Sequence, residues 1–296
     1  MDFCSSIEKL TNLSSLFVYS AAEHEILDLQ SLSSAPQFLR TLELGGRLEK
    51  LPHWIPYLHS LVTLWLCYSQ LGDDPLQSLE ALPNLELLGF LQAYEGESLT
   101  FKAGGFQRLK VLWLRRLKGL RSLTMEDGAM PHLEEIYFHN CKLVDELPLG
   151  IQHLTNLQFL RLDDMPDKLT MPLQVQDLRG APLEKIPSLV FTLIHLRYLS
   201  MRGTNVSFVP KSIRKLRNLE TLDLKYTCVT ELPAEILRLR KLRHLLLYRY
   251  EFIDNYYTFQ SARGFKAPCN IGDLISLQKL CYIEAGDRDQ WAQRQL

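Results

Sequence analysis

The sequence predicts an α/β solenoid, with a curved parallel β-sheet on its concave side and short helices and irregular returns on its convex side. Three observations predict it: a leucine pattern that recurs at a nearly constant interval, a period-two alternation inside each copy, and a proline that recurs after the alternation. Hydrophobic residues make up 46% of the 296-residue chain, which is enough to form a packed core.

The pattern Leu-x-x-Leu-x-Leu defines the repeat. Its first leucine recurs at intervals of 26, 22, 24, 24, 24 and 24 residues, at Leu13, Leu39, Leu61, Leu85, Leu109, Leu133 and Leu157. It resumes at intervals of 23 residues, with a weaker twelfth copy at the end: Leu173, Leu196, Leu219, Leu242 and then Leu277. A period of 20 to 29 residues is typical of leucine-rich repeats. The sequence therefore predicts a leucine-rich-repeat solenoid.

Each copy is expected to begin with one strand that is buried on one face. Leu222 and Leu224 alternate with polar residues, so these leucines point inward while Thr221, Asp223 and Lys225 project from the open concave side. The small polar residues that follow the strands are expected to bond to backbone groups of the turn; they are Cys141, Thr204 and Thr227.

A Leu/Ile/Val-Pro pair follows most strands, as in Leu147-Pro148 and Leu232-Pro233. Proline donates no amide hydrogen and fixes φ, so the pair ends the turn and begins a short helical return. A single repeat buries too little surface to fold alone, so the copies must stack.

Two irregularities interrupt the array. Only 16 residues separate Leu157 from Leu173, and this stretch contains two prolines. We therefore expect a repeat array over 1–165, a compressed seam over 166–175, and a second array over 176–296. Gln176, which replaces a leucine, predicts a distorted first repeat in the second array. An insertion over 248–270, rich in tyrosine and phenylalanine, is predicted to be a long loop.

The charge differs between the two arrays. Residues 1–170 contain 14 Lys/Arg and 22 Asp/Glu, a net charge of −8, and residues 171–296 contain 19 and 12, a net charge of +7, which together give −1. A basic strip on the return segments is expected to contact a partner through Lys211, Arg214, Lys215, Arg217, Arg238 and Arg240. An acidic protein surface is the expected partner; the alternatives are a merely solvated face and nucleic acid.

The central outward residues of the strands predict a binding face. Neighbouring strands lie about 4.8 Å apart, so Trp65, Trp113 and Tyr137 should form one aromatic patch. Beside it we expect four polar residues: Arg115, His139, Arg161 and Asp163. Exposed aromatic and Arg side chains are enriched at binding hot spots. The alternative is that the tryptophans only cover neighbouring strands.

Three runs closely resemble the leucine-rich-repeat domains of plant intracellular disease resistance proteins, which carry an N-terminal coiled coil and a nucleotide-binding domain. These are the runs over 177–187, 196–204 and 219–224, which resemble the family's first repeats; residues 1–165 resemble its later repeats. The order of the two blocks is thus permuted. No Gly-x-x-x-x-Gly-Lys-Ser/Thr motif occurs, so we expect no nucleotide-binding domain in this chain.

The resemblance implies a non-catalytic, protein-binding module of plant innate immunity. The early-type repeats would restrain a nucleotide-binding switch, in cis or in trans, and the later-type repeats would sense a pathogen effector or a host protein. A generic cytosolic leucine-rich-repeat signalling scaffold is the alternative, because it shares the Leu-Pro-x-x-Ile return.

The sequence contains no motif that is typical of a secreted protein, a membrane-spanning protein, an enzyme or a metal-binding protein. The start of the chain lacks a signal peptide pattern, and no apolar stretch is long enough for a membrane span. The six cysteines are scattered, which favours reduced thiols in the cytoplasm. No His-Glu-x-x-His, Gly-x-Ser-x-Gly or metal-ligand spacing occurs, so we expect no enzyme, cofactor or metal.

Overall fold

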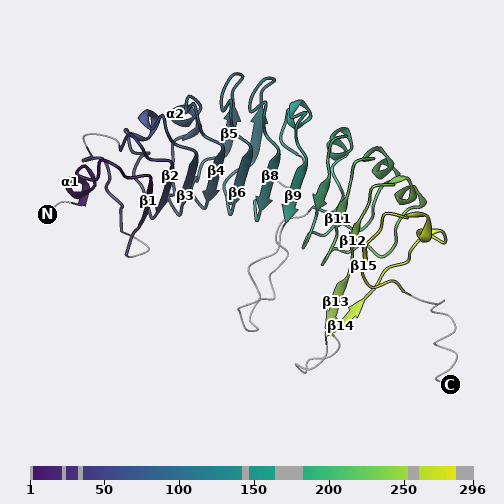
Figure 1. Cartoon of the computed structure of the whole chain (residues 1–296). Helices are drawn as coiled ribbons and strands as arrows, with labels where there is room; N and C mark the ends of the chain where they lie inside the picture. Colours follow the sequence, from purple (N-terminus) through teal and green to yellow (C-terminus); the bar gives the residue numbers. More distant parts are fainter. Residues whose placement is uncertain are drawn as a thin grey trace. The chain divides into compact units, whose positions relative to one another are not determined.

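The computed structural model describes residues 3–21, 25–32, 36–141, 147–163, 183–252 and 260–284. The chain divides into two compact units, unit 1 (1–181) and unit 2 (182–296). Within each unit, successive repeats contribute one parallel strand and then a return segment (Figure 1).

Unit 1 is built on seven described parallel strands, each hydrogen-bonded to the next in the order β1-β2-β3-β4-β6-β8-β9. Their bounds are β1 (Ser15–Tyr19), β2 (Thr41–Gly45), β3 (Thr63–Cys67), β4 (Leu87–Leu91), β6 (Val111–Arg115), β8 (Glu135–His139) and β9 (Phe159–Asp163).

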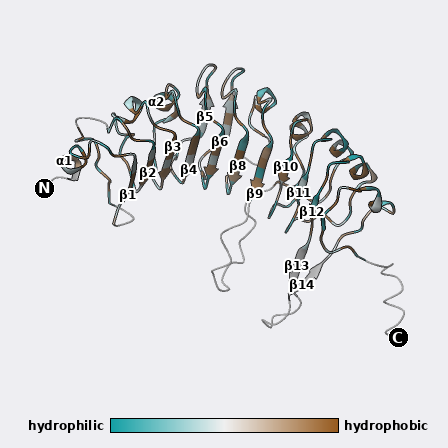
Figure 2. Ribbon diagram, in the orientation of Figure 1, coloured by the Kyte–Doolittle hydropathy of each residue, from teal (hydrophilic) through white to brown (hydrophobic). Residues whose placement is uncertain are grey.

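The register of this sheet aligns equivalent positions of every repeat. Leu42 pairs with Leu64, Leu64 with Leu88, and Leu88 with Leu112. All four are fully buried, and burying a leucine contributes about 2 kcal/mol. Hydrophobic residues accordingly follow the strands (Figure 2). The predicted leucine-rich-repeat solenoid is confirmed.

Three returns of unit 1 contain a described short helix: η1 (Ile55–Tyr57), α2 (Leu76–Leu79) and η2 (Ile151–His153). A further short helix, α1 (Phe3–Ile7), precedes β1. In the returns after β4 and β6, β5 (Ser98–Phe101) and β7 (Ser122–Met125) pair in parallel to form a second small sheet on the return side. Phe101 of β5 is fully buried, 5.3 Å edge-on from the ring of Phe106.

The recurring proline begins the return as predicted. Its carbonyl accepts a hydrogen bond from the amide three residues later, at 3.1 Å from Ile55 to Pro52 and 3.0 Å from Ile236 to Pro233. The aliphatic residue that donates this bond is fully buried. The Leu-Pro-x-x-Ile pattern therefore specifies one 3₁₀ turn in which the isoleucine, three residues after the proline, is buried in the core.

Unit 2 repeats the same plan with shorter strands. Four described parallel strands pair in the order β10-β11-β12-β15, with bounds Tyr198–Ser200, Thr221–Asp223, His244–Leu246 and Lys279–Leu280. Its returns are the 3₁₀ helices η3 (Ser188–Thr192), η4 (Lys211–Lys215), η5 (Ala234–Arg238) and η6 (Ile271–Asp273).

The turns after the strands use the predicted side chains. Thr204 and Thr227 are buried and donate to the carbonyls of Met201 and Leu224 at 2.7 and 2.8 Å. The buried Cys141 thiol lies 3.2 Å from the carbonyl of Leu114. These small polar residues are confirmed as structural.

The insertion differs from the predicted long loop. Within 248–270, β13 (Arg249–Phe252) and β14 (Gln260–Arg263) pair antiparallel as a ribbon. The chain leaves the solenoid and must return to it, and two adjacent strands satisfy each other's backbone hydrogen bonds. The predicted seam over 166–175 and the distortion at Gln176 lie outside the described residues.

Candidate functional site

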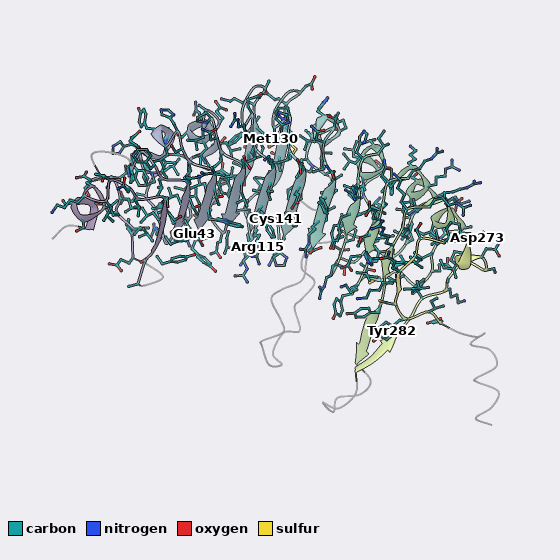
Figure 3. All side chains as sticks on the ribbon, in the orientation of Figure 1. Glu43, Arg115, Met130, Cys141, Asp273 and Tyr282 are labelled. Atoms are coloured by element: carbon teal, nitrogen blue, oxygen red, sulfur yellow. The ribbon has the colours of Figure 1, made fainter. Side chains whose placement is uncertain are left out.

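The open face of unit 1 is the face of its sheet that the returns leave uncovered. Figure 3 shows Glu43 and Arg115 on this face and Met130 on the side of the returns. The strand register aligns the predicted central residues in one row across seven strands: Phe17, Glu43, Trp65, Gly89, Trp113, Tyr137 and Arg161. The structure therefore brings the predicted aromatic residues together.

Trp65, Trp113 and Tyr137 form an aromatic stack along this row. The rings of Trp113 and Tyr137 lie parallel, with centroids 3.8 Å apart and planes 9° apart. The ring of Trp65 is tilted by 50° against Trp113, with centroids 5.9 Å apart. All three side chains are half-buried. Each ring partly covers its neighbour, and each of the three side chains stays partly exposed.

Gly89 of β4 makes the stack continuous. A Cβ atom at this position would lie 2.1 Å from a ring carbon of Trp65. Trp65 therefore lies flat across β4 and reaches Trp113 two strands away. Only glycine gives the indole this space. The ring of Trp65 therefore occupies the place in the row where a side chain at position 89 would lie.

The indole nitrogens of the stack have unused hydrogen-bonding capacity. Among the described residues, neither Trp65 nor Trp113 donates an indole hydrogen bond to the protein. The buried Trp54, by contrast, donates to the carbonyl of Leu29 at 2.9 Å. A partner that lies on the open face can therefore accept hydrogen bonds as well as contact apolar rings.

Polar residues fix one end of the stack. The guanidinium of Arg161 lies 5.6 Å from the centroid of the Tyr137 ring, and it donates from Nε to the carboxylate of the buried Asp163 at 2.9 Å. The Tyr137 hydroxyl donates to Glu135 at 2.5 Å. Arg161 and Asp163 thus position each other and hold the end of the row.

Arg115 and His139 lie two residues beyond Trp113 and Tyr137 along their strands, at the next position on the same face. The register pairs Arg115 with His139 and His139 with Asp163, so these residues form a second row beside the stack. Both side chains are half-buried. All seven residues predicted for the concave face are therefore neighbours on three strands of the open face or, for Trp65, reach them across β4.

Glu43 lies towards the opposite end of the open face. The Tyr19 hydroxyl donates to the carboxylate of Glu43, and this hydrogen bond, with burial, raises the pKa of Tyr19. Burial, and then the charge of Glu43, raise the pKa of the Cys67 thiol to about 11. Cys67 is therefore a neutral thiol at physiological pH and no nucleophile.

The outward row of unit 2 is less open than predicted. Asp223 was expected to project into solvent, but it is 4% exposed. Its carboxylate accepts the backbone amide of Lys225 at 3.1 Å and the ammonium of Lys225 at 3.2 Å. Ser200 is fully buried in the neighbouring strand. Asp223 and Ser200 are the last residues of short strands, and they are buried at the turn instead of being exposed to a partner.

Unit 2 has an aromatic ladder that the sequence analysis did not predict. Tyr226, Tyr248 and Tyr282 follow one another with ring centroids 5.2 and 5.1 Å apart. The guanidinium of Arg202 lies 5.2 Å from the centroid of the Tyr226 ring. Tyrosines recurring after consecutive strands, at 226 and 248, were the available signal, but they lie beyond the central outward position.

The predicted basic strip lies on the return side of unit 2. Lys211, Arg214, Lys215 and Arg238 belong to η4 and η5, and Arg217 and Arg240 follow these helices. All six side chains are exposed. Five of them line a common hollow, and the sixth, Lys211, does not.

Other kinds of site are not indicated in the described part of the chain. No group of three or more His, Cys, Asp or Glu residues could hold a metal ion there. None of the described helices is long and apolar enough to cross a membrane. All six cysteines are free thiols, and Cys228 and Cys269 are exposed.

Sequence comparisons agree with this architecture. A family model described as a leucine-rich repeat region matches residues 1–168 and 173–295. The disease resistance proteins RPM1 and RPH8A of Arabidopsis thaliana are 36% identical over 179 residues and 29% identical over 164 residues. These alignments cover 60% and 54% of this chain but 19% and 18% of the relatives, so the chain spans about a fifth of their length.

A solved structure shows the same fold. An internalin from Listeria monocytogenes superposes with a TM-score of 0.61 over 94% of this chain and 69% of that protein, at 16% identity. Such a likeness concerns the fold alone. From its repeats and from the matched family model, the chain belongs to the leucine-rich repeat family, and its sequence relatives are plant disease resistance proteins.

Proposed function

We propose that this chain is the protein-recognition module of a plant immune receptor and that the open face of unit 1 binds the recognised protein, either a pathogen effector or a host protein. The observation that carries the proposal is the aromatic stack of Trp65, Trp113 and Tyr137. Tryptophan, tyrosine and arginine dominate the energy of protein interfaces. The curated relatives favour this role over that of a generic cytosolic scaffold.

The stack suits protein recognition because its rings already pack against one another without a partner. Gly89 and the contact between Trp113 and Tyr137 hold the rings in place, so little side-chain entropy is lost when a partner binds. Arg115, His139 and the Arg161–Asp163 pair provide a polar rim beside the rings. An apolar centre with a polar rim is typical of protein interfaces.

The second part of the proposal assigns the basic strip of unit 2 to an acidic protein surface, such as that of a nucleotide-binding domain in cis or in trans. Its six exposed cations support it, because complementary charge steers association and gives it salt dependence. Reversing Arg214, Lys215 and Arg238 to Glu is expected to weaken a salt-sensitive association with such a domain.

A double variant tests the recognition role. Trp65→Ala/Trp113→Ala removes two rings of the stack and is expected to reduce partner capture by about tenfold or more. Quantitative mass spectrometry of proteins retained from plant extracts, with and without the pathogen, measures this effect, and circular dichroism measures the thermal midpoint.

The matched control is Phe38→Ala/Tyr57→Ala. These aromatic side chains are 62% and 63% exposed and lie outside the strands of the open face. Capture should survive in this control. Equal capture by both double variants, or a loss of capture that matches a loss of folded protein, would argue against recognition by the open face.

A further inference from the structure

A hollow of about 950 Å³ opens on the return side of unit 2, within the basic strip. Five cationic side chains line it: Arg214, Lys215, Arg217, Arg238 and Arg240. Ligand sites for small molecules measure about 300 to 1,000 Å³. The hollow is therefore of the right size for a compact ligand.

The repeat itself places the cations. Lys215 and Arg238 are 23 residues apart, as are Arg217 and Arg240, so each pair occupies the same position in consecutive repeats. The 3₁₀ helices η4 and η5, each anchored by a proline carbonyl, fix the backbone beneath them. The charges thus converge from two rigid returns.

Hydrogen bonds within the protein hold two residues that line the hollow, Asn218 and Arg240. Asn218 donates to the carbonyl of Ile194 at 3.0 Å and accepts from the ammonium of Lys241 at 2.8 Å. Arg240 donates to the main-chain carbonyl of Asp273 at 2.9 Å. Both ends of the Asn218 amide are occupied, so this residue supports the site and does not compete for a ligand.

Among the described residues, no carboxylate forms an ion pair with these cations. No acidic side chain lines the hollow, and none of the five cations forms an ion pair with the described residues. Elsewhere in the same unit, Arg197 is paired with Glu220 at 2.6 Å and Lys225 with Asp223 at 3.2 Å. Like charges held close together repel one another, and an anion of high charge density removes that repulsion.

We propose that this hollow binds a compact anion that carries three or more phosphate groups. Arginine guanidinium groups match phosphate oxygens with paired, charge-assisted hydrogen bonds. A single phosphate would leave most of the five cations unneutralised. Convergence on one hollow favours such a compact anion over an extended acidic peptide, which would need cations spaced along its length.

This inference rests on the proposed role of the basic strip and deepens it. A polyphosphorylated anion in the hollow neutralises five of the six cations that would contact an acidic protein surface. Bound ligand therefore regulates that contact by competition, so the strip responds to the concentration of the anion.

Calorimetric titration of the full chain with inorganic tripolyphosphate tests the site without any protein partner. We expect saturable binding that weakens as salt is raised, and weaker binding of inorganic orthophosphate. Arg214→Gln/Arg238→Gln should raise the Kd for tripolyphosphate by about tenfold or more. The matched control, Lys185→Gln/Lys266→Gln, removes two exposed cations of unit 2 that neither belong to the basic strip nor line the hollow and should leave the Kd nearly unchanged.

Three results would overturn the proposal: no binding of tripolyphosphate, an equal effect of the two double variants, or tighter binding of a poly-glutamate peptide than of tripolyphosphate. A further experiment measures binding of the chain to phosphatidylcholine vesicles that contain a phosphoinositide bisphosphate. Tighter binding to these vesicles than to tripolyphosphate would support the same phosphate chemistry with a lipid source. The Trp65→Ala/Trp113→Ala variant should still bind tripolyphosphate, so failure of the open-face role and failure of this site are distinguishable.

Discussion

At position 89 any side chain would collide with the indole of Trp65, since a Cβ atom there would approach a ring carbon to 2.1 Å. The same relation recurs two strands earlier, where the Tyr19 ring covers Gly45 and a Cβ atom would lie 2.2 Å from it. Gly45 and Gly89 therefore each leave space on the open face for an aromatic ring from the preceding strand. Adding even a methyl group at position 89 would displace Trp65 from the stack.

This relation explains how far the candidate site could be predicted. The row of Trp65, Trp113 and Tyr137 follows from the repeat interval, because parallel strands in register align equivalent residues. The tilt of Trp65 across β4 does not follow from it, because it depends on the missing side chain of a neighbour. The structure shows strand cover, since the ring of Trp65 lies over Gly89, and contact of the tryptophans with a ligand stays a prediction.

The contribution of the Cys67 thiol to the stability of the fold is predicted to depend on pH. Its pKa of about 11 lies above the ordinary thiol value, so the folded protein holds this proton more tightly than the unfolded chain. The resulting stabilisation is present below the ordinary thiol pKa and is lost as the pH rises towards 11.

We expect Cys67 to react with iodoacetamide at pH 8 about a hundredfold more slowly than the exposed Cys228 and Cys269. Peptide mass spectrometry after timed alkylation measures the rates. In denaturant the three thiols should react alike, and similar rates in the native protein would contradict both the burial and the raised pKa.

A side-chain ladder connects the repeats at the scale of elements. Asn84, Asn156 and Asn218 each precede the first leucine of a repeat and donate to a carbonyl of the preceding return, at 2.8, 2.7 and 3.0 Å. Ser276 donates in the same way to Arg240 at 2.8 Å. In each case the acceptor stands two residues before the first leucine of the preceding repeat. The ladder thus fixes the spacing between returns as the strands fix it on the open face.

Removing one step of this ladder should lower stability. Asn156→Ala deletes the 2.7 Å bond to Pro131 and is expected to lower the free energy of unfolding by about 1 kcal/mol. Urea denaturation followed by circular dichroism measures the change. Thr155→Ala, at the neighbouring exposed position, should leave the midpoint in place; a comparable loss there would show that Asn156 acts only through local helix or turn propensity.

The elements themselves divide into those that the sequence predicts and those that it does not. The Leu-Pro-x-x-Ile returns were predictable because proline and one buried aliphatic residue define the turn locally. The pairing of β5 with β7 depends on two returns 24 residues apart having the same extended form. The hairpin of β13 and β14 was assigned as loop because an insertion interrupts the repeat on which the prediction relied.

The whole chain is nearly neutral but has opposite charges in its two arrays, with −8 over residues 1–170 and +7 over residues 171–296. The predicted seam over 166–175 lies outside the described residues and stays a prediction. The permuted order of the two arrays stays a prediction.

Opposite net charges on the two arrays predict salt-sensitive self-association. At low ionic strength, the acidic array of one chain should attract the basic array of another, which is a head-to-tail contact that does not close on itself. Light scattering should show a mass above 34.3 kDa in dilute buffer. The mass should return to the monomer value at about 0.15 M salt, where the Debye length is about 8 Å.

Charge reversal in unit 2, by Arg214→Glu/Arg238→Glu, lowers the net charge of residues 171–296 from +7 to +3 and should weaken this association. A mass independent of salt would contradict the prediction.

The stack of Trp113 on Tyr137, with Trp65 beside it, also has an optical consequence. Rings whose centroids lie 3.8 and 5.9 Å apart are coupled in their electronic transitions, so they share excitation and give a common near-ultraviolet dichroism band. Their emission depends on what touches their edges, whereas the buried Trp54 contributes a constant background. Binding of a partner at the proposed open-face site is therefore expected to change the fluorescence of the protein itself, without an attached dye.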